Sequence, residues 1–281
     1  MNAAFGGATV REALDSAVIA IGAAGSDTPR LDAELLLADA LSVDRTALFT
    51  DPGREVAGPA VRAFQNAVRR RSVGREPVAY ILGRKGFRFI DLEVDARVLV
   101  PRPETELLVE VGLSLPGGAH VVDVGTGSGA IALALKHERP DLDVTATDTS
   151  AAALEVARAN AAALALDVTF LHGDLLAGIA SCDAVLSNPP YIAEDERGSL
   201  RPEITAHEPE GALFAGNDGL EVIRRLVPAA AAVLARGGLL AIELGQGQAG
   251  AVAGLLAAQD FGDVRALRDL ASIERVVTGR R

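Results

Sequence analysis

The chain has 281 residues, which at ~150 residues per domain predicts about two domains, each large enough to bury a core. Hydrophobic residues make up 49% of the sequence and charged residues 23%, which excludes a disordered chain. A single cysteine excludes an internal disulfide and any multi-cysteine metal site. The net charge of −11 argues against duplex DNA as the main partner, because DNA-binding faces are usually basic.

The sequence predicts neither a membrane span nor a signal peptide. Its longest uncharged apolar stretches, such as residues 226–235, are about 10 residues long, short of the roughly 18 that a membrane helix needs. Glu12 and Asp15 come before any apolar run, where a signal peptide would have a cationic segment. A cytoplasmic protein is therefore the default expectation.

Residues 1–82 predict a small helical domain. Thr9 and Glu12 have the spacing of a capping box at the start of one helix. Thr28 followed by Pro29 marks the start of the next helix, because proline is favoured at the first helical position. Helical periodicity in that second helix predicts a buried stripe of Leu31, Leu35, Ala38 and Leu41.

The pattern then changes to short alternating segments, punctuated by Gly83, Gly86 and Asp91. This pattern is typical of a β-hairpin, which we expect to link two domains over residues 83–104. From residue 119 the rhythm becomes strand, helix, strand. Strands are expected at 120–124, 143–147, 168–172, 184–187, 239–244, 264–269 and 273–278, and helices at 130–137, 151–163 and 220–235. Such alternation predicts an α/β fold with a parallel sheet covered on both faces.

A glycine-rich segment follows the first of these strands. Residues 125–129 read Gly-Thr-Gly-Ser-Gly just before a helix, so the N–H groups at the helix start could approach a ligand. Asp148 ends the next strand, about 20 residues on, where a carboxylate would accept hydrogen bonds from ribose hydroxyls. Together they predict nucleoside binding. Because Gly125, Gly127 and Ala130 also satisfy a relaxed dinucleotide pattern, a nicotinamide-dependent oxidoreductase remains an alternative.

Two later strand ends carry further polar residues. Asp174, after the third strand, could reach an adenine edge or could cap a helix. The fourth strand runs into Asn188-Pro189-Pro190-Tyr191, whose prolines lack N–H donors and leave carbonyls and the Asn188 oxygen as acceptors. These acceptors suit the NH2 group of a planar substrate, and Tyr191 would offer a face for stacking. A nicotinamide enzyme would leave this tetrapeptide unexplained.

In this order and spacing, the glycine loop, Asp148, Asp174 and the tetrapeptide resemble class I S-adenosylmethionine-dependent methyltransferases that act on a planar nitrogen. Adenine-N6 and glutamine-N5 methyltransferases share the tetrapeptide, so other segments must separate them. Several segments resemble the release factor glutamine N5-methyltransferases, the PrmC or HemK family: residues 30–37, 76–83, 99–106, 208–209, 212–213 and 216–220. The resemblance covers nearly the whole chain.

The resemblance implies a Rossmann-like, seven-stranded class I methyltransferase domain at residues 105–281. It implies that residues 1–82 form an all-α substrate-binding domain and that the β-hairpin at 83–104 is a linker. It also implies S-adenosyl-L-methionine as cofactor, S-adenosyl-L-homocysteine as product, and the glutamine of a Gly-Gly-Gln motif in peptide-chain release factors as acceptor. A monomer without a membrane or nucleic-acid partner is expected.

Site roles follow from the same resemblance. The implied cofactor contacts are Gly125, Thr126, Gly127, Ser128, Gly129, Asp148, Asp174, Leu175 and Asn188, with Asp148 at the ribose and Asp174 and Leu175 at the adenine. The glutamine would be held by Asn188, Pro189, Pro190 and Tyr191, of which Asn188, Pro189 and Tyr191 take the catalytic roles. No metal is expected, because the four histidines show no metal-ligand spacing.

Two other functions remain as alternatives. An adenine-N6 nucleic-acid methyltransferase would share the site residues, but it predicts a basic target-recognition region, which we do not find. A non-catalytic binding module associated with translation would keep the fold without the chemistry.

Overall fold

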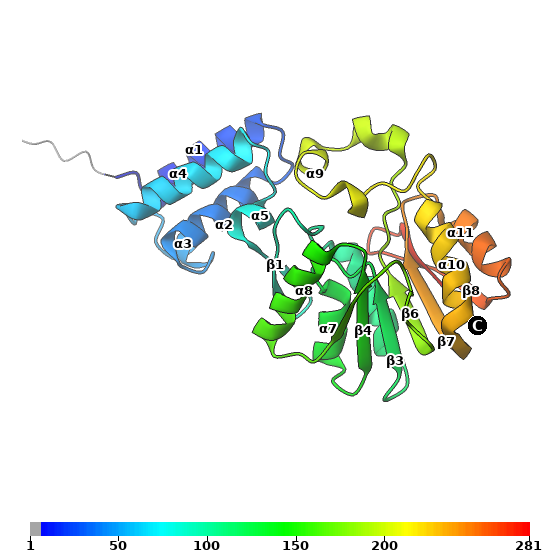
Figure 1. Ribbon diagram of the computed structural model, residues 1–281. Coiled ribbons are helices and arrows are strands. Elements are labelled where there is room, and N and C mark those ends of the chain that lie inside the picture. The colour runs from blue at the N-terminus through cyan, green and yellow to red at the C-terminus, as the bar shows by residue number, and fades with distance from the viewer. Residues whose placement is uncertain (1–6) are drawn as a thin grey trace, which may run out of the picture. The chain divides into compact units, whose positions relative to one another are not determined.

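The computed structural model describes residues 7–281, which form two compact units. One unit contains the chain up to Gly83 together with Pro202–His207, and the other contains Arg84–Arg201 and Glu208–Arg281. The first six residues of the expected helical domain lie outside the described residues. Each unit is built from its own elements (Figure 1).

The first unit is helical, as predicted. Its helices are α1 (Val10–Ala23), α2 (Pro29–Leu41), α3 (Ala47–Thr50), α4 (Pro59–Ser72) and α5 (Val78–Leu82), joined by the short α9 (Pro202–Thr205) from much later in the chain. The capping box at the start of α1 is confirmed: the Glu12 N–H donates to Thr9 Oγ1 at 3.3 Å, and the Thr9 N–H donates to the Glu12 carboxylate at 2.8 Å.

The buried stripe predicted for α2 is wrong in part. Leu31 is 39% exposed, whereas Leu36 and Leu37 are buried and Ala38 is buried as expected. The helix contacts α1, α4 and α5, so it is covered on more than one side and a single apolar stripe cannot describe it. Asp32 is buried too, because Arg71 on α4 donates a hydrogen bond to its carboxylate at 2.7 Å.

The second unit begins with a hairpin of β1 (Arg84–Phe87) and β2 (Ile90–Glu93), which pair antiparallel as predicted. Its other strands are β3 (His120–Val124), β4 (Asp143–Asp148), β5 (Thr169–His172), β6 (Cys182–Ser187), β7 (Leu234–Glu243), β8 (Gly262–Arg268) and β9 (Glu274–Arg280). Its helices are α6 (Glu106–Leu113), α7 (Ala130–Glu138), α8 (Ala151–Leu164), α10 (Glu221–Val233) and α11 (Ala249–Ala257), with 3-10 turns at Pro103–Thr105, Glu194–Ser199 and Glu210–Ala212.

These seven later strands form one sheet in the order β5-β4-β3-β6-β7-β9-β8. The strands from β5 to β7 are parallel, and β9 pairs antiparallel with both β7 and β8. The predicted seven-stranded α/β fold is confirmed, and so are the strand positions to within a few residues. The largest difference is β7, which begins at Leu234 because that residue pairs with Cys182 before the main register starts.

Helices cover both faces of this sheet, as the centre of β6 shows. Val185 belongs to a buried cluster with Ile223 and Leu226 of α10. Its neighbour Leu186 must point to the opposite face, because side chains alternate along a strand. There a Cβ added to Gly112 of α6 would come within 3.2 Å of Leu186, so helix and strand pack in close contact.

The strand order places a ligand site at a defined point. From β3 the chain adds β4 and β5 to one side, and it then returns to add β6 to the other side of β3. Ligands of open α/β sheets bind beyond the carboxyl ends of the strands at such a reversal. The loops after β3, β4, β5 and β6 therefore meet at one edge of the sheet.

Candidate functional site

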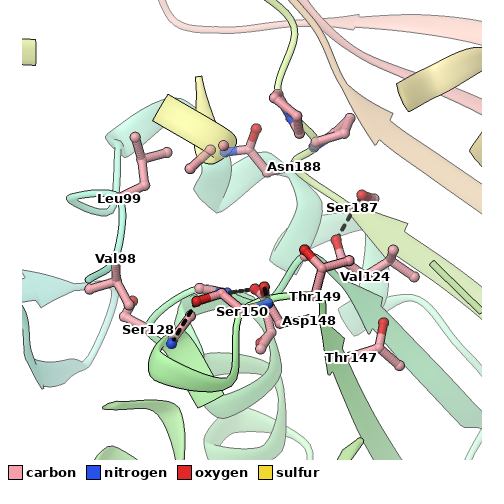
Figure 2. Close-up of a pocket in the computed structure, with 18 of the residues that line it drawn as sticks. Val98, Leu99, Val124, Ser128, Thr147, Asp148, Thr149, Ser150, Ser187 and Asn188 are labelled. Carbon is pink, nitrogen blue, oxygen red and sulfur yellow. Dashed lines mark hydrogen bonds between the residues drawn. The ribbon is translucent and has the colours of Figure 1, made fainter. Parts of the chain in front are cut away.

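A cavity of about 430 Å³ opens at this edge of the sheet, which is within the usual size of a small-molecule site. Its walls come from the loops that follow β3, β4, β5 and β6 and from the segment between the hairpin and α6. Figure 2 shows the Asn188 side chain at one end of the cavity and Asp148 with Ser150 at the other.

The glycine-rich loop connects β3 to α7. Four of its five residues, Gly125 to Ser128, line the cavity, and Gly129 does not. The N–H groups of Gly125 and Thr126 donate to the Thr147 carbonyl at 2.9 and 3.0 Å, which fixes the loop to β4. Gly129 precedes α7 with φ +86°, and an added Cβ would lie 2.8 Å from Leu133. The positive φ therefore favours glycine here, and a larger residue would also force the Leu133 side chain to shift.

Asp123, the last residue but one of β3, holds the loop from beneath. Its Oδ2 accepts a hydrogen bond from the Thr126 hydroxyl at 2.6 Å and another from the Ala132 N–H at 3.2 Å. Burial raises the pKa of this carboxyl to about 7, and its Oδ1 has no hydrogen-bond partner among residues 7–281. Asp123 was not predicted as a site residue, although it lies two positions before the glycine-rich loop.

Asp148 ends β4 with its carboxylate at the cavity wall. Its Oδ2 accepts from the Gly127 N–H at 2.9 Å and its Oδ1 from the Ser150 N–H at 2.8 Å. The Ser150 hydroxyl in turn caps α8 by accepting from the Ala153 N–H at 3.1 Å. Each carboxylate oxygen keeps a further lone pair, so Asp148 is oriented by the backbone and can still accept from a ligand hydroxyl.

Asp174 and Leu175 follow β5 and also line the cavity. The Asp174 carboxylate pairs with Arg225 of α10 and accepts from no helix N–H among the described residues, so the helix-cap alternative is not what the structure shows. Leu175 has φ +50°, and its carbonyl accepts from the Thr147 hydroxyl at 2.8 Å. The loop after β5 is thereby tied to β4, beside Asp148.

Three residues of the tetrapeptide after β6 line the cavity, and the fourth, Tyr191, does not. Asn188, Pro189 and Pro190 line the cavity, and the Asn188 Nδ2 donates to Thr105 Oγ1 at 3.0 Å. Tyr191 is not among the lining residues. Its hydroxyl lies 3.4 Å from Glu243 Oε1, and burial, followed by the negative charge of Glu243, raises the pKa of the tyrosine. A stacking role for Tyr191 stays a prediction.

The segment before α6 also contributes to the cavity wall, as do α10 and residues 209–212. Arg97, Val98, Leu99, Pro101, Arg102 and Thr105 all line it. Arg102 donates to Glu208 at 2.5 Å, and Glu208 is buried with Oε2 unpartnered among the described residues. Burial raises the pKa of Glu208 despite this ion pair. The sequence offers two interpretations of Arg102, Glu104 and Glu106, a salt-bridged helix start or direct contact with the substrate, and the Arg102–Glu208 pair shows a salt bridge at this position.

The cavity has the size of a small-molecule site, with oriented acceptors at Asp148 and apolar and backbone groups at Leu175. The N–H groups of Gly125, Thr126 and Gly127 are used within the protein, by the Thr147 carbonyl and by Asp148. Within the described part of the chain, no group of three or more His, Cys, Asp or Glu side chains could hold a metal ion. No helix in residues 7–281 is long and apolar enough to cross a membrane.

Two family models match the sequence. The PrmC N-terminal domain matches residues 12–83, and the methyltransferase small domain matches residues 103–207. The loop at 125–129, Asp148 and the tetrapeptide at 188–191 all fall inside the second match.

Curated relatives match over almost the full length. The chain is 43% identical over 263 residues to the release factor glutamine methyltransferase of Caulobacter vibrioides, covering 91% of each chain. It is 41% identical over 279 residues to the release factor glutamine methyltransferase of Koribacter versatilis, covering 97% of this chain and 99% of that relative. Among solved structures, a methyltransferase from Pyrococcus furiosus shares the fold with a TM-score of 0.53 at 20% identity, over 68% of this chain and 88% of that one.

Proposed function

Because this chain belongs to the release factor glutamine methyltransferase family, we propose that it methylates the side-chain nitrogen (N5) of the glutamine in the Gly-Gly-Gln motif of peptide-chain release factors. The methyl donor in this proposal is S-adenosyl-L-methionine, and the product is S-adenosyl-L-homocysteine. The enzyme would then act in translation termination, as a monomer in the cytoplasm, without a nucleic-acid substrate.

One observation carries the proposal beyond family membership. Asn188, Pro189 and Pro190 line the same cavity as the glycine loop and Asp148, although they follow both in the sequence by 40 or more residues. Acceptors for an NH2 group and a nucleoside-binding loop therefore share one volume, which is what methyl transfer to a planar nitrogen requires.

The cavity-lining residues have the following proposed roles in binding the cofactor. The loop at residues 125–129 would hold the methionine part of the cofactor, Asp148 the ribose hydroxyls, and Asp174 with Leu175 the adenine. Asp148 is held for this role by the N–H groups of Gly127 and Ser150. We further propose that residues 1–82 form the substrate-binding domain, with residues 83–104 as the linker to the methyltransferase domain at 105–281.

The proposed chemistry is a direct transfer. When bound, S-adenosylmethionine would supply a sulfonium methyl group. The amide nitrogen would form its bond to this methyl group in line as the S–CH3 bond breaks, with S-adenosylhomocysteine as the leaving group, and would then release one proton to solvent or a nearby acceptor. An amide nitrogen is a poor nucleophile, because its lone pair is delocalised into the carbonyl. Asn188 Oδ1 and the Pro189 carbonyl would accept both N–H hydrogens, which raises the electron density on nitrogen and fixes its orientation. Pro189 and Pro190 add no N–H donors that would compete for these acceptors.

Asn188→Ala tests the catalytic assignment. We expect a loss of methyl transfer of at least a hundredfold, because the variant loses the side-chain acceptor for the amide. S-adenosylmethionine affinity, measured by calorimetry, should change by less than about fivefold, since Asp148 and the glycine loop remain. Methyl transfer at the wild-type rate in Asn188→Ala would contradict the assignment, and loss of cofactor binding would show that Asn188 serves the cofactor instead.

A further inference from the structure

Thr105 lies directly behind Asn188 and is 4% exposed. It ends the 3-10 turn Pro103–Thr105, immediately before α6, and its Oγ1 accepts the hydrogen bond from Asn188 Nδ2. On the other side, the Thr105 hydroxyl is close enough to Glu243, at the end of β7, to lower the pKa of that carboxyl. Thr105 therefore connects the proposed amide-binding residue to a buried carboxylate.

The hydrogen bond of Thr105 determines which end of the Asn188 amide group faces the ligand. A hydroxyl has one hydrogen to donate, and an ionised carboxylate can only accept. When the Thr105 hydroxyl hydrogen is turned toward Glu243, Thr105 Oγ1 can only accept from Asn188. It then faces the NH2 end of that side chain, as the 3.0 Å hydrogen bond from Nδ2 shows. Asn188 Oδ1 makes no hydrogen bond within the described residues and is left to accept from a ligand.

Glu243 has few groups around it to stabilise its charge. It is 1% exposed, its Oε2 has no hydrogen-bond partner in the described part of the chain, and Tyr191 approaches Oε1 at 3.4 Å. Burial and the neighbouring Glu104 raise the pKa of Glu243 to about 7, while Thr105, Tyr191 and the positive charge of Arg275 oppose the rise. The carboxylate therefore changes charge near neutral pH.

Protonation of Glu243 would allow the Asn188 amide group to take the opposite orientation. A protonated carboxyl can donate to Thr105 Oγ1, and the Thr105 hydroxyl is then free to donate to Asn188 Oδ1. The Asn188 amide would turn over and present its NH2 group to the substrate NH2, which is a mismatch of two donors. Ionised Glu243 excludes this arrangement.

We propose that Thr105 and Glu243 are positioning residues that hold the Asn188 amide with its oxygen toward the substrate nitrogen, an inference that rests on the proposed glutamine methylation. Glu243 sets the direction of the Thr105 hydroxyl, and Thr105 sets the orientation of Asn188. Tyr191 takes part through its contact with Glu243, which gives it a role away from the cavity.

The threonine is tested by a matched pair of variants in the full chain. Thr105→Val keeps the shape but cannot accept a hydrogen bond, whereas Thr105→Ser keeps the hydroxyl. We expect Thr105→Val to lower kcat for methylation of a Gly-Gly-Gln release factor at least tenfold, with S-adenosylmethionine affinity within about twofold of wild type. Thr105→Ser should recover kcat to within about threefold. Equal activity of the valine variant and wild type, or a serine variant no better than valine, would overturn the proposal.

The carboxylate is tested by a pH profile. The wild-type kcat should fall as the pH decreases through about 7, where Glu243 gains its proton, and this limb should be absent in Glu243→Gln. Glu243→Gln should also have a lower kcat than wild type at pH 8. An unchanged acid limb in Glu243→Gln would overturn the role of the carboxylate, even if the Thr105 variants fail to fold.

A readout without turnover separates this proposal from the proposed function. In 15N-labelled protein, the Asn188 side-chain NH2 signal, assigned by its loss in Asn188→Ser, should shift with a midpoint near pH 7 in wild type and show no such shift in Glu243→Gln. If wild type methylates no release factor yet this titration is present, the methylation fails while the hydrogen-bond relay stands. If methylation occurs and the Asn188 signal does not titrate, the relay fails alone.

Discussion

Asp148 is the charged residue whose orientation at the cavity depends on two backbone N–H groups. We predict that Asp148→Asn lowers the affinity for S-adenosylmethionine by about tenfold to a hundredfold, because a hydrogen bond to a charged acceptor contributes about 1.5–3 kcal/mol. Calorimetry with purified protein measures this directly. Asp167→Asn, an exposed change outside the cavity, is the control. Equal affinities of the Asp148 and Asp167 variants would refute the role of Asp148.

Asp123 predicts a measurable pH dependence of folding. Its pKa is raised to about 7 in the native state from an ordinary value of 3.8, so the native state keeps a proton that the unfolded state loses. The stability linked to this proton is complete below about pH 4 and is lost as the pH rises through 7. It amounts to about 4 kcal/mol at most.

Asp123→Asn removes this titration, because an amide does not ionise. We therefore predict that, from pH 5 to pH 8, the unfolding free energy of the variant rises relative to that of wild type by a few kcal/mol. Urea unfolding at several pH values gives the difference. Other carboxyls, Glu243 included, titrate in both proteins and cancel in the comparison. A constant difference across this range would contradict the assignment of a raised pKa to Asp123.

The residues at strand ends could be predicted from the sequence, and those behind them could not. The carboxyl ends of neighbouring parallel strands meet at one edge, so Asp148 and Asn188 were expected to share a site and do line one cavity. Thr105 is 83 residues from Asn188 and meets it only through the packing of α6 against the sheet. The contact of the Tyr191 hydroxyl with Glu243 could not be predicted either, because the two residues are 52 positions apart in the sequence.

At the scale of elements, Asn160 joins three segments of the methyltransferase unit. From α8 its Oδ1 accepts from the Glu93 N–H at 2.7 Å, and its Nδ2 donates to the carbonyls of Glu93 at 3.0 Å and Ser128 at 2.9 Å. The hairpin strand β2 and the glycine loop are thus tied to one helix by a side chain that is 1% exposed.

We predict that Asn160→Ala lowers the unfolding free energy by about 2–4 kcal/mol, because it leaves buried backbone groups without partners. It should also weaken S-adenosylmethionine binding severalfold, since the Ser128 carbonyl loses its donor. Chemical denaturation and calorimetry measure the two effects. The exposed Arg158→Ala on the same helix should change stability by less than about 0.5 kcal/mol. Similar stabilities of the two variants would rule out the joining role.

Most of the secondary structure follows from local pattern, and the exceptions have a tertiary cause. The alternation of apolar strands and Ala-rich helices predicted the seven strands from β3 to β9 and the helices α7, α8 and α10, because the buried central strands read as apolar runs. Helix α11 was not predicted. The stripe on α2 failed because α1, α4 and α5 all pack on that helix. No local pattern indicates that Pro202–His207 belongs to the helical unit, because that placement depends on the pairing of Arg71 and Arg75 with Glu203.

At the scale of the whole molecule, the fold alone does not determine the substrate. One fold can host different functions, and the adenine-N6 alternative would use the same tetrapeptide. The named relatives cover more than nine-tenths of this chain and are release factor glutamine methyltransferases, which does not favour that alternative. The acidic net charge of −11 also argues against a DNA substrate.

The most direct test is transfer of a labelled methyl group from S-adenosylmethionine to a purified peptide-chain release factor. Two parallel reactions use the same factor with its Gly-Gly-Gln glutamine replaced by alanine, and duplex DNA. We predict label on the intact factor alone. Label on duplex DNA, or equal label on the factor without the glutamine, would contradict glutamine methylation as the function of this protein.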